Sequence, residues 1–138
     1  MKQKTQKLFV YGTLRRGFAL HSRLARLEAR FLGKGRITGS LYNLGEYPGA
    51  VPSRSRGKGI EGEVYELGEP AKQLKTLDRV EEFNAAQPER SLFVRQKTTV
   101  RMTDGKRVRA WAYFLPKRPS RARVLVSGDF AESRRLHR

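Results

Sequence analysis

The chain of 138 residues, 38% of them hydrophobic, is suited to one folded domain with a single core. The absence of cysteine and the presence of only two histidines exclude disulfides, a thiolate nucleophile and metal sites built from cysteine or from histidine alone. No apolar run approaches the ~20 residues of a membrane span, and the start of the chain lacks the apolar segment of a signal peptide. The formal net charge of +17 leaves a nucleic-acid partner open.

These properties predict a cytoplasmic protein that forms one domain over residues 1–138, with flexible basic ends at 1–7 and 132–138. The first predicted element is a short buried strand, Leu8–Tyr11, followed by a loop that Gly12 and Gly17 bracket. A helix is expected over Phe18–Phe31 because apolar residues recur at helical spacing, at Leu20, Leu24, Leu27 and Phe31. A strand, a glycine loop and a helix in this order direct backbone N–H groups toward an anion.

The middle of the chain reads as two strands separated by a loop. Arg36–Leu44 alternates and predicts a strand, and Gly45–Pro52 predicts a loop whose path two prolines and two glycines fix. Tyr47 in that loop is a candidate for the wall of a pocket or for a plug at the rim of the core. Ser53–Gly59 is expected to be an exposed tip, and Ile60–Leu67 a strand with two distinct faces.

A second helix and a hairpin are predicted in the last half of the chain. Glu69-Pro70 opens the helix, since proline is favoured in a first turn, and its apolar face consists of Ala71, Leu74, Leu77 and Val80. Ser91–Met102 and Arg107–Leu115 predict a long hairpin around Asp104-Gly105. The apolar segment Val124–Val126 is expected to pack against the body of the domain.

Glu81 is an acidic residue on the apolar face of the second helix. It follows Leu74 by seven positions and Leu77 by four, so its side chain is expected to face the core. Burial and the nearby helix C-terminus both favour the protonated carboxyl, which predicts a raised pKa. A carboxyl with a pKa near neutrality suits general acid–base catalysis, whereas Glu82 is expected to face solvent.

A purely structural role for these acidic residues is the alternative. Glu81 then pairs with one of the many arginines, for example Arg95, and Asp78 caps the helix or forms a structural pair. The spacing alone does not decide between the two interpretations.

Two motifs resemble those of the γ-glutamylcyclotransferase-like superfamily. Tyr11-Gly12-Thr13-Leu14 is similar to its signature loop, and Leu77–Glu81 resembles its second motif, a Leu-Asp pair followed three residues later by the catalytic glutamate. Further segments resemble the family in the same order along the chain: Gly17 with His21, Tyr47–Val51, Ile60–Tyr65 and Val126–Phe130.

The resemblance implies an α+β fold, a small mixed and barrel-like sheet with flanking helices. It also implies that a γ-glutamyl substrate cyclises, its α-amino nitrogen attacking its own γ-carbonyl to give 5-oxoproline, without a metal or a cofactor. Glu81 is then the general base and acid, and the substrate-binding residues are Tyr11, Gly12, Thr13, Leu14, Tyr47 and Arg95. Backbone N–H groups of the loop are expected to hold the substrate carboxylate or the oxyanion.

Two positions depart from the family pattern. Glu82 stands where relatives usually carry glycine, and Phe93 stands where many members carry tyrosine two residues before the retained Arg95. Two other functions stay open, a small-molecule-binding module without turnover and a basic nucleic-acid-binding protein on the same scaffold. The identity of the substrate and the oligomeric state also stay open.

Overall fold

The computed structural model of the protein describes residues 4–11, 27–44, 48–53, 59–119 and 123–124. The elements in those ranges are, in chain order, β1 (Gln6–Val10), β2 (Arg30–Asn43), β3 (Pro48–Pro52), β4 (Gly59–Leu67), α2 (Pro70–Val80), the 3₁₀ turn η1 (Pro88–Arg90), β5 (Val94–Met102), β6 (Arg107–Phe114) and β7 (Arg123–Val124).

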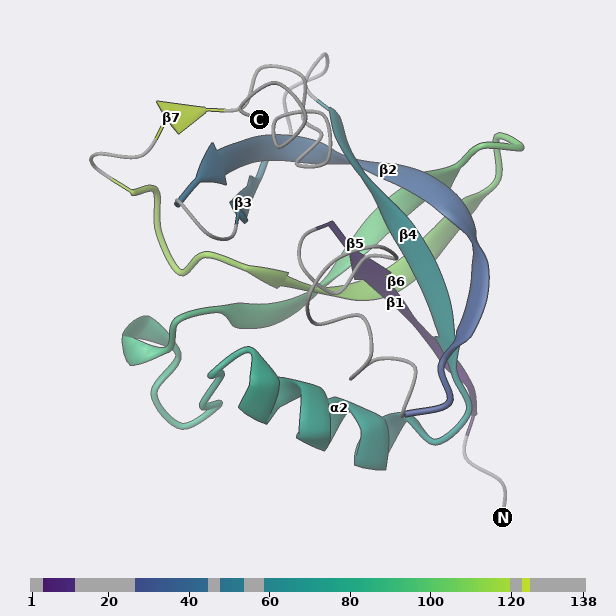
Figure 1. Ribbon diagram of the computed structural model, residues 1–138, viewed down its shortest axis with the longest axis horizontal. Coiled ribbons are helices and arrows are strands. Elements are labelled where there is room, and N and C mark those ends of the chain that lie inside the picture. Colours follow the sequence, from purple (N-terminus) through teal and green to yellow (C-terminus); the bar gives the residue numbers. More distant parts are fainter. Residues whose placement is uncertain (1–3, 12–26, 45–47, 54–58, 120–122, 125–138) are drawn as a thin grey trace, which may run out of the picture.

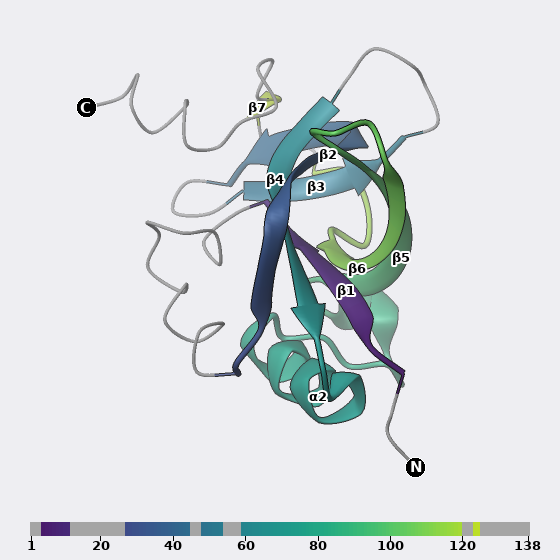
Figure 2. The ribbon, with the colours of Figure 1, turned by 90° about the vertical axis from the view of Figure 1, so that its right-hand side faces the viewer.

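Five strands close into a barrel (Figures 1 and 2), which confirms the predicted barrel-like α+β fold. The strand order is β3-β2-β4-β1-β6-β5. In addition, β2 pairs with Arg101 and Met102 of β5, and this pairing closes the ring β2-β4-β1-β6-β5. The neighbours pair antiparallel except β1 and β6, which run parallel with Leu8 opposite Trp111. β3 and β7 pair with β2 outside this closed ring.

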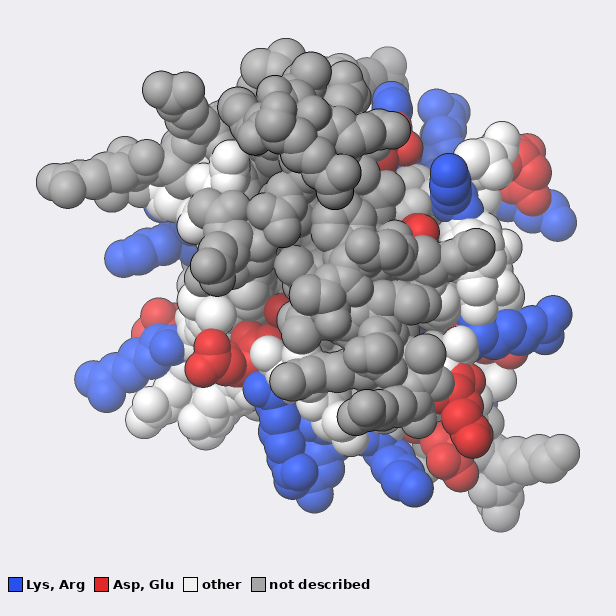
Figure 3. All heavy atoms as spheres, viewed as in Figure 1, with Lys and Arg blue, Asp and Glu red and all other residues white. Residues whose placement is uncertain are grey.

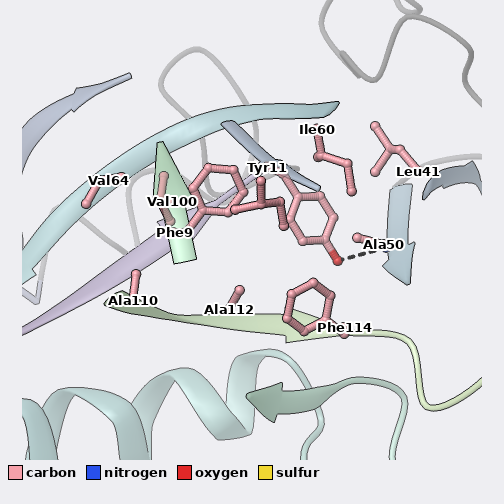
Figure 4. Close-up of a cluster of buried hydrophobic side chains, with 11 residues drawn as sticks. Phe9, Tyr11, Leu41, Ala50, Ile60, Val64, Val100, Ala110, Ala112 and Phe114 are labelled. Carbon is pink, nitrogen blue, oxygen red and sulfur yellow. Dashed lines mark hydrogen bonds between the residues drawn. The ribbon is translucent and has the colours of Figure 1, made fainter. Parts of the chain in front are cut away.

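Alternate residues of each strand fill the barrel (Figure 4). β4 shows the two faces that the sequence predicts, since Ile60 and Val64 lie inside the barrel whereas Tyr65 and Leu67 pack outside it. The inner cluster contains buried residues from six strands: Phe9, Tyr11, Ile37, Leu41, Ala50, Ile60, Val64, Val100, Ala110, Ala112 and Phe114.

A second apolar layer joins the barrel to α2. Its buried members are Leu8, Val10, Tyr65, Leu67, Leu74, Leu77, Phe93 and Tyr113. The helix begins with Pro70 at its first turn, as predicted. Ala71 is exposed, however, and its predicted place on the buried face is taken by Gln73. The Gln73 amide accepts from the Glu69 N–H at 2.8 Å and donates to the Leu27 carbonyl at 2.7 Å, so that both of its polar atoms are satisfied.

The predicted end of the first helix at Phe31 is wrong. Leu27 and Glu28 form a turn, in which Glu28 has a φ of 60°, and β2 already begins at Arg30. Arg30 and Phe31 pair with Glu66 and Tyr65 of β4, and this pairing overrides the local helical pattern. Residues 12–26 lie outside the described ranges, and so does the rest of the predicted helix.

Two more boundaries differ from the prediction. Pro48–Pro52, read as part of a loop, forms the strand β3, with a proline at each end, and pairs with β2 in the sheet. The hairpin strand begins at Val94 rather than at Ser91, whose buried hydroxyl accepts a hydrogen bond from the Asn84 N–H at 2.8 Å. The predicted turn is confirmed by Gly105, which has a φ of 89°. Val124 pairs with Tyr42 of β2, whereas the other two residues of the predicted apolar segment, 125 and 126, lie outside the described residues.

The described basic side chains project around the rim of the molecule in the view of Figure 3, with acidic ones among them. Among the described residues, no helix is long and apolar enough to cross a membrane.

Candidate active site

Glu81 lies at the C-terminal end of α2, on the side that faces the barrel. The helix ends at Val80, and the Glu81 N–H still donates to the Leu77 carbonyl at 2.9 Å. Leu74 and Leu77 on the same stripe are buried, and Glu81 itself is half-buried. Burial raises the pKa of the Glu81 carboxyl to about 7, which confirms the predicted direction. Both protonation states are therefore populated near neutral pH.

No side-chain hydrogen bond or ion pair among the described residues reaches the Glu81 carboxyl. The pairing with Arg95 that was the structural alternative does not occur, because Arg95 contacts Asp78 instead. The charge of Glu81 lies close enough to two phenols, Tyr11 and Tyr113, to help raise the pKa of each.

Tyr11 continues β1 and directs its ring into the barrel (Figure 4). Its hydroxyl donates to the Tyr113 carbonyl at 2.5 Å and accepts from the Ala50 N–H at 3.1 Å. The phenol thus ties the end of β1 to β6 and β3. Burial, mainly, raises the pKa of Tyr11 far above its usual value, so this residue remains a hydrogen-bond donor at neutral pH.

Asp78 joins α2 to the barrel one helical turn before Glu81. The Tyr113 hydroxyl donates to Asp78 Oδ1 at 2.6 Å, and Arg95 Nε lies 3.3 Å from the same oxygen. Burial and then the bond to Asp78 raise the pKa of Tyr113 well above its ordinary range. Asp78 therefore forms a structural pair, as one of the sequence interpretations predicts.

Arg95 is held between this carboxylate and an aromatic ring. Its guanidinium carbon lies 4.6 Å from the centre of the Trp111 ring, within cation–π range, and Lys97 Nζ lies 4.8 Å from the same ring. The indole N–H donates to Gln6 Oε1. Arg95 Nε is buried without a well-aligned hydrogen bond, although it touches Asp78.

The turn after α2 ends the helix at its C-cap residue, Glu81. The Phe83 N–H donates to the Asp78 carbonyl at 2.8 Å, and the Glu82 N–H to the Arg79 carbonyl at 3.2 Å. This is the hydrogen-bond pattern of a Schellman motif, whose C′ residue takes a left-handed conformation. Glu82 occupies that position with a φ of 53° and is exposed, as predicted.

The other predicted substrate-binding residues, and the departure from the family pattern at Phe93, are placed as follows. Gly12, Thr13, Leu14 and Tyr47 lie outside the described residues, so the geometry of the signature loop stays a prediction. Phe93 is buried in the layer between α2 and the barrel. No group of three or more histidine, cysteine or acidic residues that could hold a metal ion occurs within the described ranges.

Tyr113 is a site residue that the sequence interpretation missed. The signal is the alternation of β6, because Ala110, Ala112 and Phe114 fill the barrel and Tyr113 must therefore point outward toward α2. Its partner Arg95 stands directly opposite it on β5. The position of the hairpin turn sets this register. Counting residues along both strands from Gly105 would therefore have predicted that Arg95 lies opposite Tyr113.

One sequence family matches nearly the whole chain, with the description "Gamma-glutamyl cyclotransferase, AIG2-like" over residues 8–132. A Drosophila melanogaster protein, inferred to be a gamma-glutamylcyclotransferase, is 33% identical over 125 residues, covering 83% of this chain and 73% of that protein. A Methanocaldococcus jannaschii protein with the same inferred activity is 34% identical over 130 residues, covering 92% and 97%. The gamma-L-glutamyl-butirosin B gamma-glutamyl cyclotransferase of Niallia circulans is 37% identical over 108 residues, covering 77% and 64%.

Solved structures show the same fold. YkqA from Bacillus subtilis superposes with a TM-score of 0.74 at 29% identity, over 97% of this chain and 42% of the longer YkqA chain. An AIG2-like protein from Mus musculus superposes with a TM-score of 0.75 at 22% identity, over 93% of this chain and 89% of that one. The second likeness concerns the fold alone.

Proposed function

Because this chain belongs to the AIG2-like family of gamma-glutamyl cyclotransferases, we propose that it cyclises a γ-glutamyl amide to 5-oxoproline. In this reaction the α-amino nitrogen forms a bond to the γ-carbonyl carbon, and the bond from that carbon to the leaving nitrogen breaks. The α-ammonium loses two protons as it becomes the lactam N–H, and the leaving nitrogen gains two, so that it departs as an ammonium ion. The reaction needs proton transfer and charge stabilisation, and as proposed it uses no metal or cofactor.

Glu81 is the residue that we propose to carry both proton transfers. The observation that supports this role is its half-buried carboxyl, without a partner among the described residues and with a pKa raised to about 7. Each of the two protons passes by the same route: the carboxylate form accepts it from the α-nitrogen, and the resulting carboxylic acid gives it to the leaving nitrogen. A carboxyl with a pKa near the working pH both accepts and donates a proton efficiently, because the carboxylate and the carboxylic acid have similar free energies at that pH.

We propose that the loop after β1 binds the substrate. Backbone N–H groups of Gly12, Thr13 and Leu14 are assigned to the substrate carboxylate or the oxyanion, and Tyr47 to the pocket wall. The hydroxyl of Tyr11 is occupied by Tyr113 and Ala50. Its proposed contribution is therefore to hold the start of the loop against β3.

Arg95 is assigned to substrate binding through the guanidinium N–H groups that do not face Asp78. The ring of Trp111 and the carboxylate of Asp78 restrict the orientation of this side chain, which lowers the entropy lost when a ligand binds. An anionic substrate is also attracted by a chain with a formal net charge of +17, an effect on the association rate that salt weakens.

The test is a panel of γ-glutamyl amines and γ-glutamyl amino acids assayed for 5-oxoproline release, with Glu81→Gln beside the wild type. We expect the variant to lose about 10²- to 10⁴-fold in kcat, the usual contribution of a general acid–base group. Glu82→Gln is the matched control, since it removes the same charge at the next, exposed position and should keep its activity.

Equal turnover of Glu81→Gln and the wild type would remove Glu81 from the mechanism. A wild type that binds a panel member saturably but releases no 5-oxoproline would favour the alternative of a binding module without turnover.

A further inference from the structure

The outer face of the β5–β6 hairpin carries basic side chains that the proposed reaction does not use. Val100, Ala110 and Ala112 point into the barrel, so the residues that alternate with them point outward. The hairpin turn projects beyond the closed part of the barrel (Figure 1). Its outward residues past the candidate site are Lys97, Thr99, Arg101, Arg107, Arg109 and Trp111.

The register brings positive charges together on this face. Arg101 stands directly opposite Arg107, and the next outward pair toward the site is Thr99 with Arg109. On the other side, Arg101 pairs with Arg36 of β2. Like charges directly opposite each other destabilise a sheet by up to about 1 kcal/mol per pair. The arrangement therefore opposes folding, which favours a role outside the protein's own stability.

The positive charges on the outer face of the hairpin have no ion-pair partner in the described part of the chain. The ion pairs recorded there join Arg36 to Glu61 and Arg95 to Asp78. None reaches the basic groups on the outer face of the hairpin, namely Lys97, Arg101, Arg107 and Arg109. The acidic residue of the turn, Asp104, uses Oδ1 to accept from the Lys106 N–H at 2.9 Å.

Two of the four basic groups are also held in place. Arg109 Nη1 donates to Thr99 Oγ1 at 2.9 Å, and Lys97 lies over the Trp111 ring. A side chain that is already restrained loses less entropy when it binds a ligand than a free one does. Binding of a negatively charged ligand to Arg109 and Lys97 therefore costs less side-chain entropy.

We propose that the outer face of the β5–β6 hairpin, defined by Lys97, Arg101, Arg107 and Arg109, binds the phosphate backbone of nucleic acid. Outward residues on one strand repeat every ~6.8 Å and the strands lie ~4.8 Å apart, so the four charges form an extended, open row. A small anion is held best in an enclosed site, whereas a chain of phosphates can contact the whole row at once. The inference goes beyond the proposed cyclisation and does not depend on Glu81.

The experiment measures binding of the full chain to a fluorescent 20-nucleotide single strand and to a 20-base-pair duplex across a series of NaCl concentrations. The test variant is Arg101→Gln/Arg107→Gln/Arg109→Gln. The matched control replaces three exposed basic residues of α2, Lys72→Gln/Lys75→Gln/Arg79→Gln, and lowers the net charge equally. The melting temperature of each variant is measured first to show that it is folded.

We expect the hairpin variant to bind at least tenfold more weakly at 0.1 M salt. Its slope of log K against log[salt] should fall by about 2 on the single strand and by about 3 on the duplex, as for three lost phosphate contacts. The α2 variant should lose much less. Comparison of the affinities for the single strand and the duplex shows which of the two the protein prefers. Equal weakening of both variants would overturn the proposal, as would a wild type that binds neither oligonucleotide.

Discussion

Two carboxyl groups one helical turn apart at the end of α2 have opposite surroundings. Asp78 receives the Tyr113 hydroxyl at 2.6 Å and touches Arg95 Nε at 3.3 Å, so its negative charge is stabilised by partners on two strands. Glu81 lies against the same barrel without such a partner among the described residues, and burial raises its pKa to about 7. The helix places both carboxyls against the barrel, but the residues on β5 and β6 give a hydrogen bond and an ion pair to Asp78 alone.

Breaking the paired carboxyl should have the largest effect on stability. Asp78→Asn leaves the Arg95 guanidinium without its counter-ion and weakens the bond from Tyr113. Because both charged side chains are about one-fifth exposed, we expect a loss of about 2–3 kcal/mol, below the 3–5 kcal/mol of a fully buried pair. Urea unfolding at pH 7 measures this loss.

A double-mutant cycle with Tyr113→Phe makes the test specific. We expect a coupling energy of about 1 kcal/mol or more between Asp78 and Tyr113, because the two side chains share a direct hydrogen bond. Additive losses in the double variant would show that Asp78 stabilises the protein through other contacts. The bond to Tyr113 would then not explain the difference between Asp78 and Glu81.

The unpaired carboxyl should show the opposite behaviour. A pKa raised from 4.5 to about 7 means that folded Glu81 binds more protons than unfolded Glu81 between these values. Stability is therefore lost as the pH rises from about 4.5 to 7, and stays lower above that. Since the residue is only half-buried, we expect Glu81→Gln to be more stable than the wild type by about 1–2 kcal/mol at pH 8.5, less than the full shift implies.

Urea unfolding at pH 8.5 and at pH 4.5 measures this difference, and the gain should nearly vanish at the lower pH. Glu82→Gln serves as the control for loss of one negative charge at an exposed position. A Glu81→Gln variant that is no more stable than this control at pH 8.5 would contradict the desolvation of Glu81. The same substitution is expected to lower kcat by about 10²- to 10⁴-fold. A gain in stability would then show that the carboxyl destabilises the fold at the residue that the proposed reaction needs.

The sequence predicts the elements whose signals are local. Asp104-Gly105 gave the hairpin turn, the alternation of Ile60–Leu67 gave the two faces of β4, and the spacing from Leu77 gave the position and raised pKa of Glu81. Each signal lies within a few residues of the element that it specifies, so no knowledge of the tertiary structure was needed.

The contacts that distinguish the two carboxyls are not local. Arg95 lies 17 positions after Asp78 in the sequence, and the register of the hairpin, not the helix, brings it there. Gln73 is buried because its amide reaches Leu27 across the fold. The closure of β2 onto β5 likewise joins distant segments. The residue that lies opposite a given side chain is determined by the register of the whole sheet. The helical spacing of apolar residues carries no information about that register.

The turn that follows Glu81 offers the smallest but sharpest test of how its position is fixed. Glu82 has a φ of 53° at the C′ position of the Schellman motif, a conformation that costs a residue with a side chain more than it costs glycine. Since the Glu82 side chain is exposed, we expect Glu82→Gly to stabilise the protein by about 0.5–1 kcal/mol, the relief of strain exceeding the added entropy of the unfolded chain.

Glu82→Ala separates backbone strain from charge, because alanine removes the carboxyl but keeps the Cβ atom. Urea unfolding of the two variants at pH 7 should therefore give a gain for glycine and little or none for alanine. The bonds from Phe83 to Asp78 and from Glu82 to Arg79 involve backbone atoms only, so the glycine variant keeps the motif and with it the place of Glu81. Equal stability of the glycine and alanine variants would show that the left-handed residue carries no strain.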